Sequence, residues 1–247
     1  IIEAMSERTA EDVCNMLRHA SIIPGMECGL PEACDTAAPE DINVYTDGSF
    51  IFGQTKWAGL GGAAAWWPGR RFEESPITEG EDDIVVDFEE KPGGVVCSSP
   101  VSGLAGSSTR AELAAGIIAV AGPGPVHIGT DSMAFLLKAT CILKRLECGD
   151  PPYQLWAMHK DGDLWAHFER AARAKGPHAI RISKVKGHAT DEEVAKGDVR
   201  QVDKLGNDAA DEGANKAALA TRPEYEEYFR LMCERQEWYN MLVHKVA

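Results

Sequence analysis

The chain has 247 residues and a net charge of −14, from 39 acidic and 25 basic side chains. Hydrophobic residues make up 44% and charged residues 26%, which is typical of a globular protein and argues against a disordered or fibrous one. No apolar run approaches the roughly 20 residues of a membrane-spanning helix, and no signal peptide is visible. We therefore expect an intracellular protein, in the cytoplasm or nucleus, that contacts no membrane.

The hydrophobic pattern predicts strands that alternate with helices. An amphipathic helix is expected over residues 1–20 and a linker rich in Pro and Gly over 21–41. Expected strands follow at 42–45, 57–67, 84–88, 126–129 and 179–185. The expected helices are 110–120, capped by Ser108 or Thr109, then 132–146, 163–175, 207–220 and 223–246. This alternation predicts α/β layering.

The acidic charge is concentrated in two segments. Residues 1–46 hold nine acids and two bases, and residues 73–90 hold nine acids and no base. The rest of the chain is therefore close to neutral. A low overall pI does not exclude a nucleic-acid partner, because one local face is enough to bind it.

The seven cysteines are scattered, and no pair has the Cys-x-x-Cys spacing of a zinc site. Cys28 and Cys34 could form half of a metal site, but reduced, incidental thiols are the simpler interpretation. The chain begins with Ile1 rather than Met. We interpret it as a piece of a longer protein.

Four acids occupy comparable places beside the predicted elements. Two follow strands and two lie near the starts of helices: Asp47, Glu112, Asp131 and Asp211. Strand ends and neighbouring helices meet in one crevice of an α/β sheet, so these side chains are expected to converge. Each acid alone is more simply a turn or capping residue. Together they predict a site for Mg²⁺ or Mn²⁺, and two such ions can catalyse phosphodiester hydrolysis.

The motifs around these acids, in this order, resemble the type 1 ribonuclease H family. They are VYTDGS at 44–49, TRAEL at 109–113, TDSM at 130–133, DLW at 163–165, VKGH at 185–188 and NDAAD at 207–211. The resemblance covers about residues 42–220. It implies a ribonuclease H-like α/β fold with a five-stranded mixed sheet flanked by helices. The acidic segment, at about 70–100, is then an insertion, which we expect to project away from the substrate as a charged loop.

The resemblance also implies the activity and the residues that carry it out. The activity is endonucleolytic hydrolysis of the RNA strand of RNA–DNA hybrids, which leaves 5′-phosphate and 3′-hydroxyl ends. Asp47, Glu112, Asp131 and Asp211 would be the ligands of two Mg²⁺ ions, for which Mn²⁺ could substitute. Asp208 is the rival for the fourth position. His188, on a mobile loop, would aid proton transfer or product release, although a lone histidine more commonly has no such role.

Residues beside these motifs are expected to contact the substrate. They are Gly48, Ser49, Ser108, Thr109, Arg110, Ser132, Lys184 and Lys186. The two lysines would contact phosphates. Ser108 and Thr109 stand where many family members carry Asn or Gln to contact the RNA minor groove. A basic handle that some members have is short here, over 146–160.

These expectations divide the chain into three parts. An N-terminal helix and acidic linker (1–41) precede the catalytic domain (42–220), and a helical tail (221–247) follows it. Other domains of a longer, retroelement-type polyprotein are possible partners, and a divergent eukaryotic enzyme is an alternative source. A catalytically silent binding module and a DNA-acting nuclease of the same superfold are the alternative functions.

Overall fold

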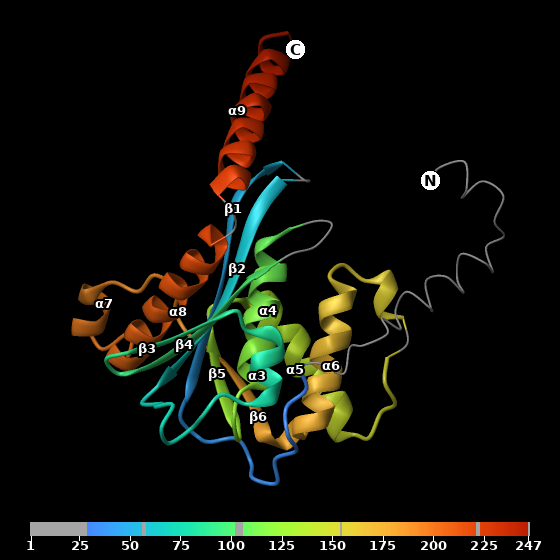
Figure 1. The fold of residues 1–247 in the computed structure, drawn as a ribbon, viewed down its shortest axis with the longest axis vertical. Coiled ribbons are helices and arrows are strands. Elements are labelled where there is room, and N and C mark those ends of the chain that lie inside the picture. The colour runs from blue at the N-terminus through green and yellow to red at the C-terminus, as the bar shows by residue number, and fades with distance from the viewer. Residues whose placement is uncertain (1–28, 56–57, 102–105, 154, 221–222, 247) are drawn as a thin grey trace, which may run out of the picture.

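The computed structural model describes residues 29–55, 58–101, 106–153, 155–220 and 223–246. The helix expected over 1–20 lies outside the described residues. Among the described residues a mixed sheet of six strands has the order β3-β4-β2-β1-β5-β6 (Figure 1). Its strands are β1 (Val44–Thr55), β2 (Ala58–Pro68), β3 (Asp87–Lys91), β4 (Gly94–Val101), β5 (Val126–Thr130) and β6 (Ile180–Lys184).

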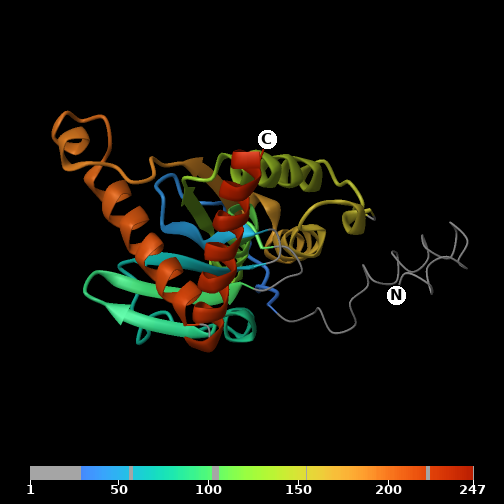
Figure 2. The same cartoon turned by 90° about the horizontal axis from the view of Figure 1, so that it is seen from above.

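Helices cover both faces of the sheet (Figure 2). On one face α4, α5 and α6 enclose the larger hydrophobic core, and on the other face α8 packs against β1, β2 and β4. The helices are α3 (Glu79–Ile84), α4 (Ser108–Ala121), α5 (Met133–Glu147), η1 (Trp156–Met158), α6 (Gly162–Lys175), η2 (Pro177–Ala179), α7 (Asp191–Ala195), α8 (Gln201–Leu219) and α9 (Pro223–Val246).

The directions of the strands and their pairing determine where the parallel part of the sheet ends. β5 runs parallel to β1 and to β6, whereas β2 is antiparallel to β1 and to β4. β1 pairs with β5 only as far as Thr46 and Thr130, and beyond them it continues in a long hairpin with β2. The chain therefore leaves the parallel part of the sheet immediately after these two threonines.

The acidic segment is part of the sheet and not the projecting loop that its charge suggested. Thr78 and Glu81 form a capping box that begins α3, and β3 then pairs with β4 as a sixth strand at the edge. Phe88 of β3 packs edge-to-face on Phe72. Four of the five expected strands are present. In place of the expected strand at 84–88 lie the end of α3 and the beginning of β3, and β4 was not expected.

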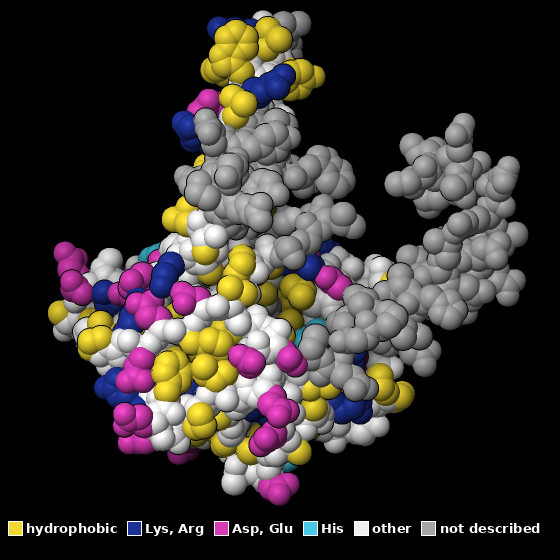
Figure 3. Space-filling view, in the orientation of Figure 1, with side chains coloured by type: hydrophobic (Ala, Val, Ile, Leu, Met, Phe, Trp, Pro, Cys, Tyr) yellow, Lys and Arg dark blue, Asp and Glu magenta, His cyan; other side chains and the backbone are white. Residues whose placement is uncertain are grey.

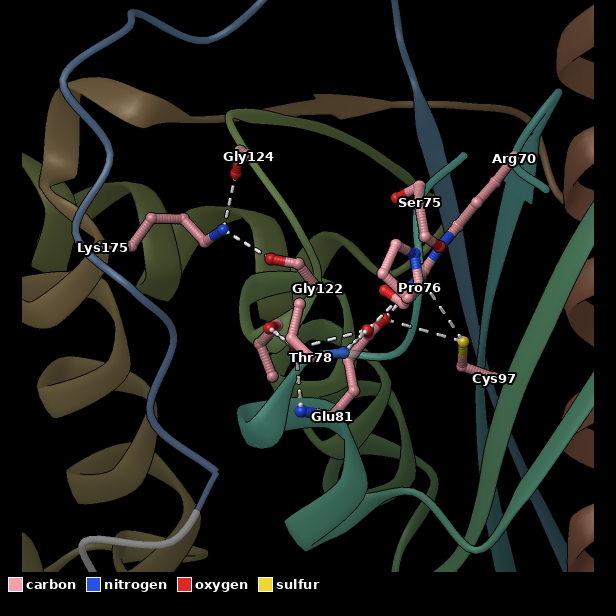
Figure 4. A network of polar contacts seen from close by, with 10 residues as sticks. Arg70, Ser75, Pro76, Thr78, Glu81, Cys97, Gly122, Gly124 and Lys175 are labelled. Carbon is pink, nitrogen blue, oxygen red and sulfur yellow. Dashed lines mark hydrogen bonds and ion pairs between the residues drawn. The ribbon is translucent and has the colours of Figure 1, made fainter. Parts of the chain in front are cut away.

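A buried polar network holds α3 and the far end of α6 in place (Figure 4). Arg70 donates to both carboxylate oxygens of Glu81, at 2.5 and 2.8 Å, and both side chains are almost completely buried. Lys175, also buried, donates to the carbonyls of Gly122 and Gly124. Burial lowers the pKa of Lys175 to about 8. These contacts lie where β5 begins, at the opposite end of that strand from Asp131.

Two helix boundaries differ from the sequence-based expectation. Ser107, rather than Ser108 or Thr109, caps α4 by accepting a hydrogen bond from the Arg110 amide. α8 begins at Gln201 instead of residue 207, six residues earlier. Its first six residues include two apolar side chains, Val202 and Leu205, and both are exposed.

The described parts of the N-terminal segment (29–41) and of the C-terminal tail (223–246) contact the rest of the protein differently. In the segment expected to be a linker, the Cys34 amide donates to the Lys175 carbonyl at 2.8 Å. α9, a helix as expected, projects from the body beside the β1–β2 hairpin (Figure 1) and exposes apolar side chains near its end, Trp238 among them (Figure 3). None of the described helices is both long and apolar enough to cross a membrane.

Candidate active site

β1 places Asp47 between α4 and α8. Because alternate side chains of a strand point to opposite faces, Asp47 points to the same face as Tyr45, whose ring packs against α8. Gly48 points to the α4 face, where a Cβ atom would overlap the backbone nitrogen of Glu112. Only glycine allows this close approach of β1 and α4, which brings Glu112 beside Asp47.

Asp131 joins the same cluster from β5. Thr46 and Thr130 are partners in the parallel β1–β5 pair, and each is followed directly by an aspartate. Carboxylate oxygens of Asp47, Glu112 and Asp131 all lie within 4.8 Å of one another. Three of the four predicted acids thus meet where the parallel strands end.

Asp211 approaches the cluster from α8 and lies beside Asp47, but it is not one of the three acids whose oxygens all lie within 4.8 Å of one another. It lies well inside α8 rather than near its start. Asp208, the rival for the fourth position, is ion-paired with Lys204 at 2.8 Å. This arrangement favours Asp211 over Asp208 as the fourth acid.

Crowding changes the acidity of this cluster. Burial, the charge of Asp131 and the hydrogen bond with Asp211 raise the pKa of Asp47 to about 7. Burial and the charges of Asp47 and Asp131 raise the pKa of Glu112 to about 9, although the charge of Lys184 opposes this shift. Protons or cations must therefore balance the negative charge near neutral pH.

The donor set suits a hard divalent cation. Carboxylate oxygens are the ligands that Mg²⁺ and Mn²⁺ prefer. Oε2 of Glu112 is buried and accepts no hydrogen bond from any described residue. A buried acceptor without a partner is costly, and a cation would satisfy it. Asp47, Glu112, Asp131 and Asp211 are therefore the residues that could hold a metal ion.

His188 lies on a loop that is anchored beside Asp131. A Cβ atom at Gly187 would overlap the Asp131 carboxylate, so the loop backbone approaches this side chain closely. Ala189 is buried, whereas His188 is exposed and adopts a left-handed backbone conformation with φ of 49°. The loop is thus held on both sides of an accessible imidazole.

The two predicted phosphate-binding lysines lie on either side of the end of β6. Lys184 donates to the backbone carbonyl of Asp131 at 2.5 Å and to that of Val185 at 2.8 Å. Lys186 forms an ion pair with Glu193 of α7. An open groove of about 470 Å³ is lined by both lysines and by Arg200. Contact with phosphate stays a prediction for these residues.

Arg110 has structural partners. Its guanidinium donates to both carboxylate oxygens of Asp163, at 2.8 and 2.6 Å, and lies 3.5 Å from Asp161. The side chain is largely buried. Arg110 thus holds the beginning of α4 against the beginning of α6, and its contact with substrate stays a prediction.

The predicted hydroxyl contacts occupy different settings. Ser108 is exposed and Thr109 half-buried in the first turn of α4, close to Glu112. Ser132 caps α5. The Ser49 hydroxyl donates to Oδ1 of Asn215 at 2.6 Å. The exposed first turn of α4 leaves Ser108 the most accessible of the four.

Sequence reasoning missed Asn215, whose amide nitrogen donates to Oδ1 of Asp211 at 3.0 Å. It belongs to none of the motifs. Its place four residues after Asp211 was a usable signal, because such residues are neighbours on a helix surface. Sequence reasoning also missed α7, although Thr190 and Glu193 have the spacing of a capping box.

No protein-family model and no curated protein matches the chain. Among solved structures it is similar to "Solution structure of PFV RNase H domain", with 21% identity over 71% of this chain and 93% of that one, and a TM-score of 0.44. It is also similar to "LC9-RNase H1, a type 1 RNase H with the type 2 active-site motif", with 17% identity over 77% of this chain and 82% of that one, and a TM-score of 0.42. With native prototype foamy virus protease-reverse transcriptase the identity is 19% over 76% of this chain and 23% of that one, and the TM-score is 0.45.

At these identities the similarity concerns the fold alone. The sheet and helices of the chain itself agree with the ribonuclease H-like α/β fold expected from its motifs, since the sheet is mixed, helices cover both faces and one strand is added at the edge. The chain spans less than a quarter of the foamy virus protease-reverse transcriptase.

Proposed function

We propose that the chain hydrolyses the RNA strand of RNA–DNA hybrids endonucleolytically and leaves 5′-phosphate and 3′-hydroxyl ends. The observation that carries the proposal is the meeting of Asp47, Glu112 and Asp131, with Asp211 beside Asp47 and with one buried Glu112 oxygen that has no partner. Mutual repulsion makes such a group of acids unfavourable on its own. A cation site explains why the acids lie together.

In this proposal the four carboxylates hold two Mg²⁺ ions, or Mn²⁺ in their place. Two bound divalent cations supply activation of water and stabilisation of the leaving oxygen in phosphodiester hydrolysis. Gly48 lets β1 and α4 approach closely enough for Asp47 and Glu112 to meet, and Gly187 lets the histidine loop approach Asp131. His188, accessible beside Asp131, moves a proton to or from the reacting groups.

The remaining predicted residues would orient the hybrid. Lys184 and Lys186 lie next to the histidine loop and would contact phosphates of the bound strands. Ser108, exposed in the first turn of α4, carries a hydroxyl that can hydrogen-bond to the RNA 2′-hydroxyl. The 2′-hydroxyl distinguishes RNA from DNA, so this contact would direct cleavage to the RNA strand.

Cleavage of matched substrates tests the proposal. A labelled RNA–DNA hybrid, a double-stranded RNA and a double-stranded DNA of one sequence are incubated with Mg²⁺, Mn²⁺ or EDTA. We expect the RNA strand of the hybrid to be cut in the presence of either cation and to remain intact in EDTA. Cleavage of the DNA duplex instead would indicate a DNA-acting nuclease. Binding of the hybrid without cleavage would indicate a silent module, and either result would overturn the proposal.

Two aspartates of α8 provide a matched pair of variants. Asp211→Asn should reduce cleavage by more than the roughly 10- to 100-fold that is typical of losing an outer-shell partner of a metal site. Asp208→Asn removes a charge from the same helix outside the cluster and should leave cleavage near that of the unmodified chain. Equal activity of the two variants in the hybrid assay would contradict the ligand assignment.

A further inference from the structure

β1 and α8 lie side by side next to the acid cluster, and their residues meet at matching intervals. Two residues along a strand span about 6.6 Å, and four residues along a helix span about 6 Å. Asp47 meets Asp211, and Ser49, two residues later, meets Asn215, four residues later. The backbones are close here, because a Cβ atom at Gly62, the partner of Ser49 in β2, would overlap the Ala214 carbonyl oxygen.

The hydrogen bonds between these residues form a chain with one consistent direction. An ionised carboxylate only accepts hydrogen bonds, so the Asn215 amide group must turn its NH₂ toward Asp211. Its carbonyl oxygen then faces Ser49, whose hydroxyl donates to it. Ser49 therefore fixes the orientation of the Asn215 amide, and the amide in turn holds one oxygen of Asp211.

We propose that Asn215, held by Ser49, is a positioning residue that orients the Asp211 carboxylate toward Asp47 and so strengthens divalent cation binding. The inference rests on the metal site of the proposed function. Outer-shell partners that hydrogen-bond to ligating carboxylates fix the ligands, and their loss typically weakens metal binding by about 10- to 100-fold. Ser49, expected from the sequence to contact substrate, has here a role within the protein.

Mn²⁺ affinity of the full chain, measured by electron paramagnetic resonance titration, tests this inference without any activity measurement. Asn215→Ala should weaken binding about 10- to 100-fold. Ser49→Ala should weaken it less, because the amide keeps its place on Asp211. Asn240→Ala is the matched control, since Asn240 also has a side-chain hydrogen bond with the residue four positions earlier, in which it accepts from Gln236 of α9, and this variant should bind Mn²⁺ normally.

A double substitution separates positioning from a general structural effect. In the Asp211→Asn background, Asn215→Ala should cause no further loss of affinity, because its effect passes through Asp211. An additional loss of the same size in that background would overturn the inference, as would Mn²⁺ affinity within twofold of the unmodified chain in Asn215→Ala. If Asn215→Ala does not fold, a normal affinity in Ser49→Ala overturns it. Absence of Mn²⁺ binding by the unmodified chain would overturn the proposed function itself.

Discussion

Single residues decide how closely the elements of the acid cluster approach one another. Gly48 lets β1 lie against the first turns of α4, and Gly187 lets the histidine loop lie against Asp131. At position 48 a side chain would force the backbones that carry Asp47 and Glu112 apart, and at position 187 it would collide with the Asp131 carboxylate. The positions of the acids thus depend on residues that carry no chemistry of their own.

The loop anchored by Gly187 leads to a prediction for His188. Its left-handed backbone is tolerated by asparagine, so His188→Asn removes the imidazole with little strain. We expect hybrid cleavage to slow by about 100-fold, at the lower end of typical general acid–base contributions. Mn²⁺ affinity should stay unchanged. The exposed His244 of α9 supplies the control, since His244→Asn should cleave normally. A collapse of Mn²⁺ affinity in His188→Asn would argue for a role in metal binding.

The acids of the cluster could be predicted from the sequence because each stands in a recognisable motif, although Asp211 lies well inside α8 and not near a helix start. Asp47 and Asp131 are such cases, since each directly follows a threonine of a paired strand. The i,i+4 spacing could place Asn215 beside Asp211, but it could not reveal the contact with Ser49, because that contact depends on the distance between α8 and β1. That distance is set by tertiary packing at Gly62, which no local pattern reveals.

At the scale of elements, the acidic segment shows why charge alone was a poor guide. Four of its nine acids form ion pairs with bases outside the segment. Lys216 of α8 contacts both Asp87 and Glu89, and Arg71 pairs with Glu90. The capping box at Thr78 was the readable sign of a helix, whereas the ion pairs across elements could not be foreseen. Replacing the segment would therefore remove a packed edge of the sheet.

The buried Arg70–Glu81 pair gives a prediction for this edge. Glu81→Gln leaves the Arg70 charge buried without its counter-charge, which typically costs about 3–5 kcal/mol of unfolding free energy. Glu90→Gln breaks the exposed pair with Arg71 and should cost less than about 1 kcal/mol. Urea unfolding of both variants measures the difference. Equal losses would mean that Glu81 does not anchor α3.

At the scale of the whole molecule, net charge and local charge have separate consequences. The net charge of −14 belongs to the whole chain, whereas the groove beside the histidine loop is lined by three bases (Lys184, Lys186 and Arg200) and two acids (Asp198 and Asp203). Negative charge is also concentrated in the partly buried cluster of Asp47, Glu112 and Asp131. Repulsion between these carboxylates lowers the free energy of unfolding of the whole fold, because the strands and helices that carry the acids must hold them close together.

This repulsion predicts a specific pH dependence for the metal-free protein. The pKa of Glu112 is about 9 in the folded chain and near its ordinary value of 4.5 in the unfolded chain. The folded state therefore binds more protons between these values, and its stability falls as pH rises from about 4.5 to about 9. Glu112→Gln removes this dependence. In EDTA the variant should gain stability relative to the unmodified chain across that window, on the order of a few kcal/mol at its upper end. Below pH 4.5 the difference should be constant.

Added Mg²⁺ should reverse the order of stability of the two chains near pH 8, because only the unmodified chain has all four carboxylates to bind the ion and is stabilised by that binding. Unfolding free energies measured at several pH values, with EDTA and with Mg²⁺, test both parts. A difference between the two chains that does not change with pH would mean that Glu112 is not held in a repulsive cluster.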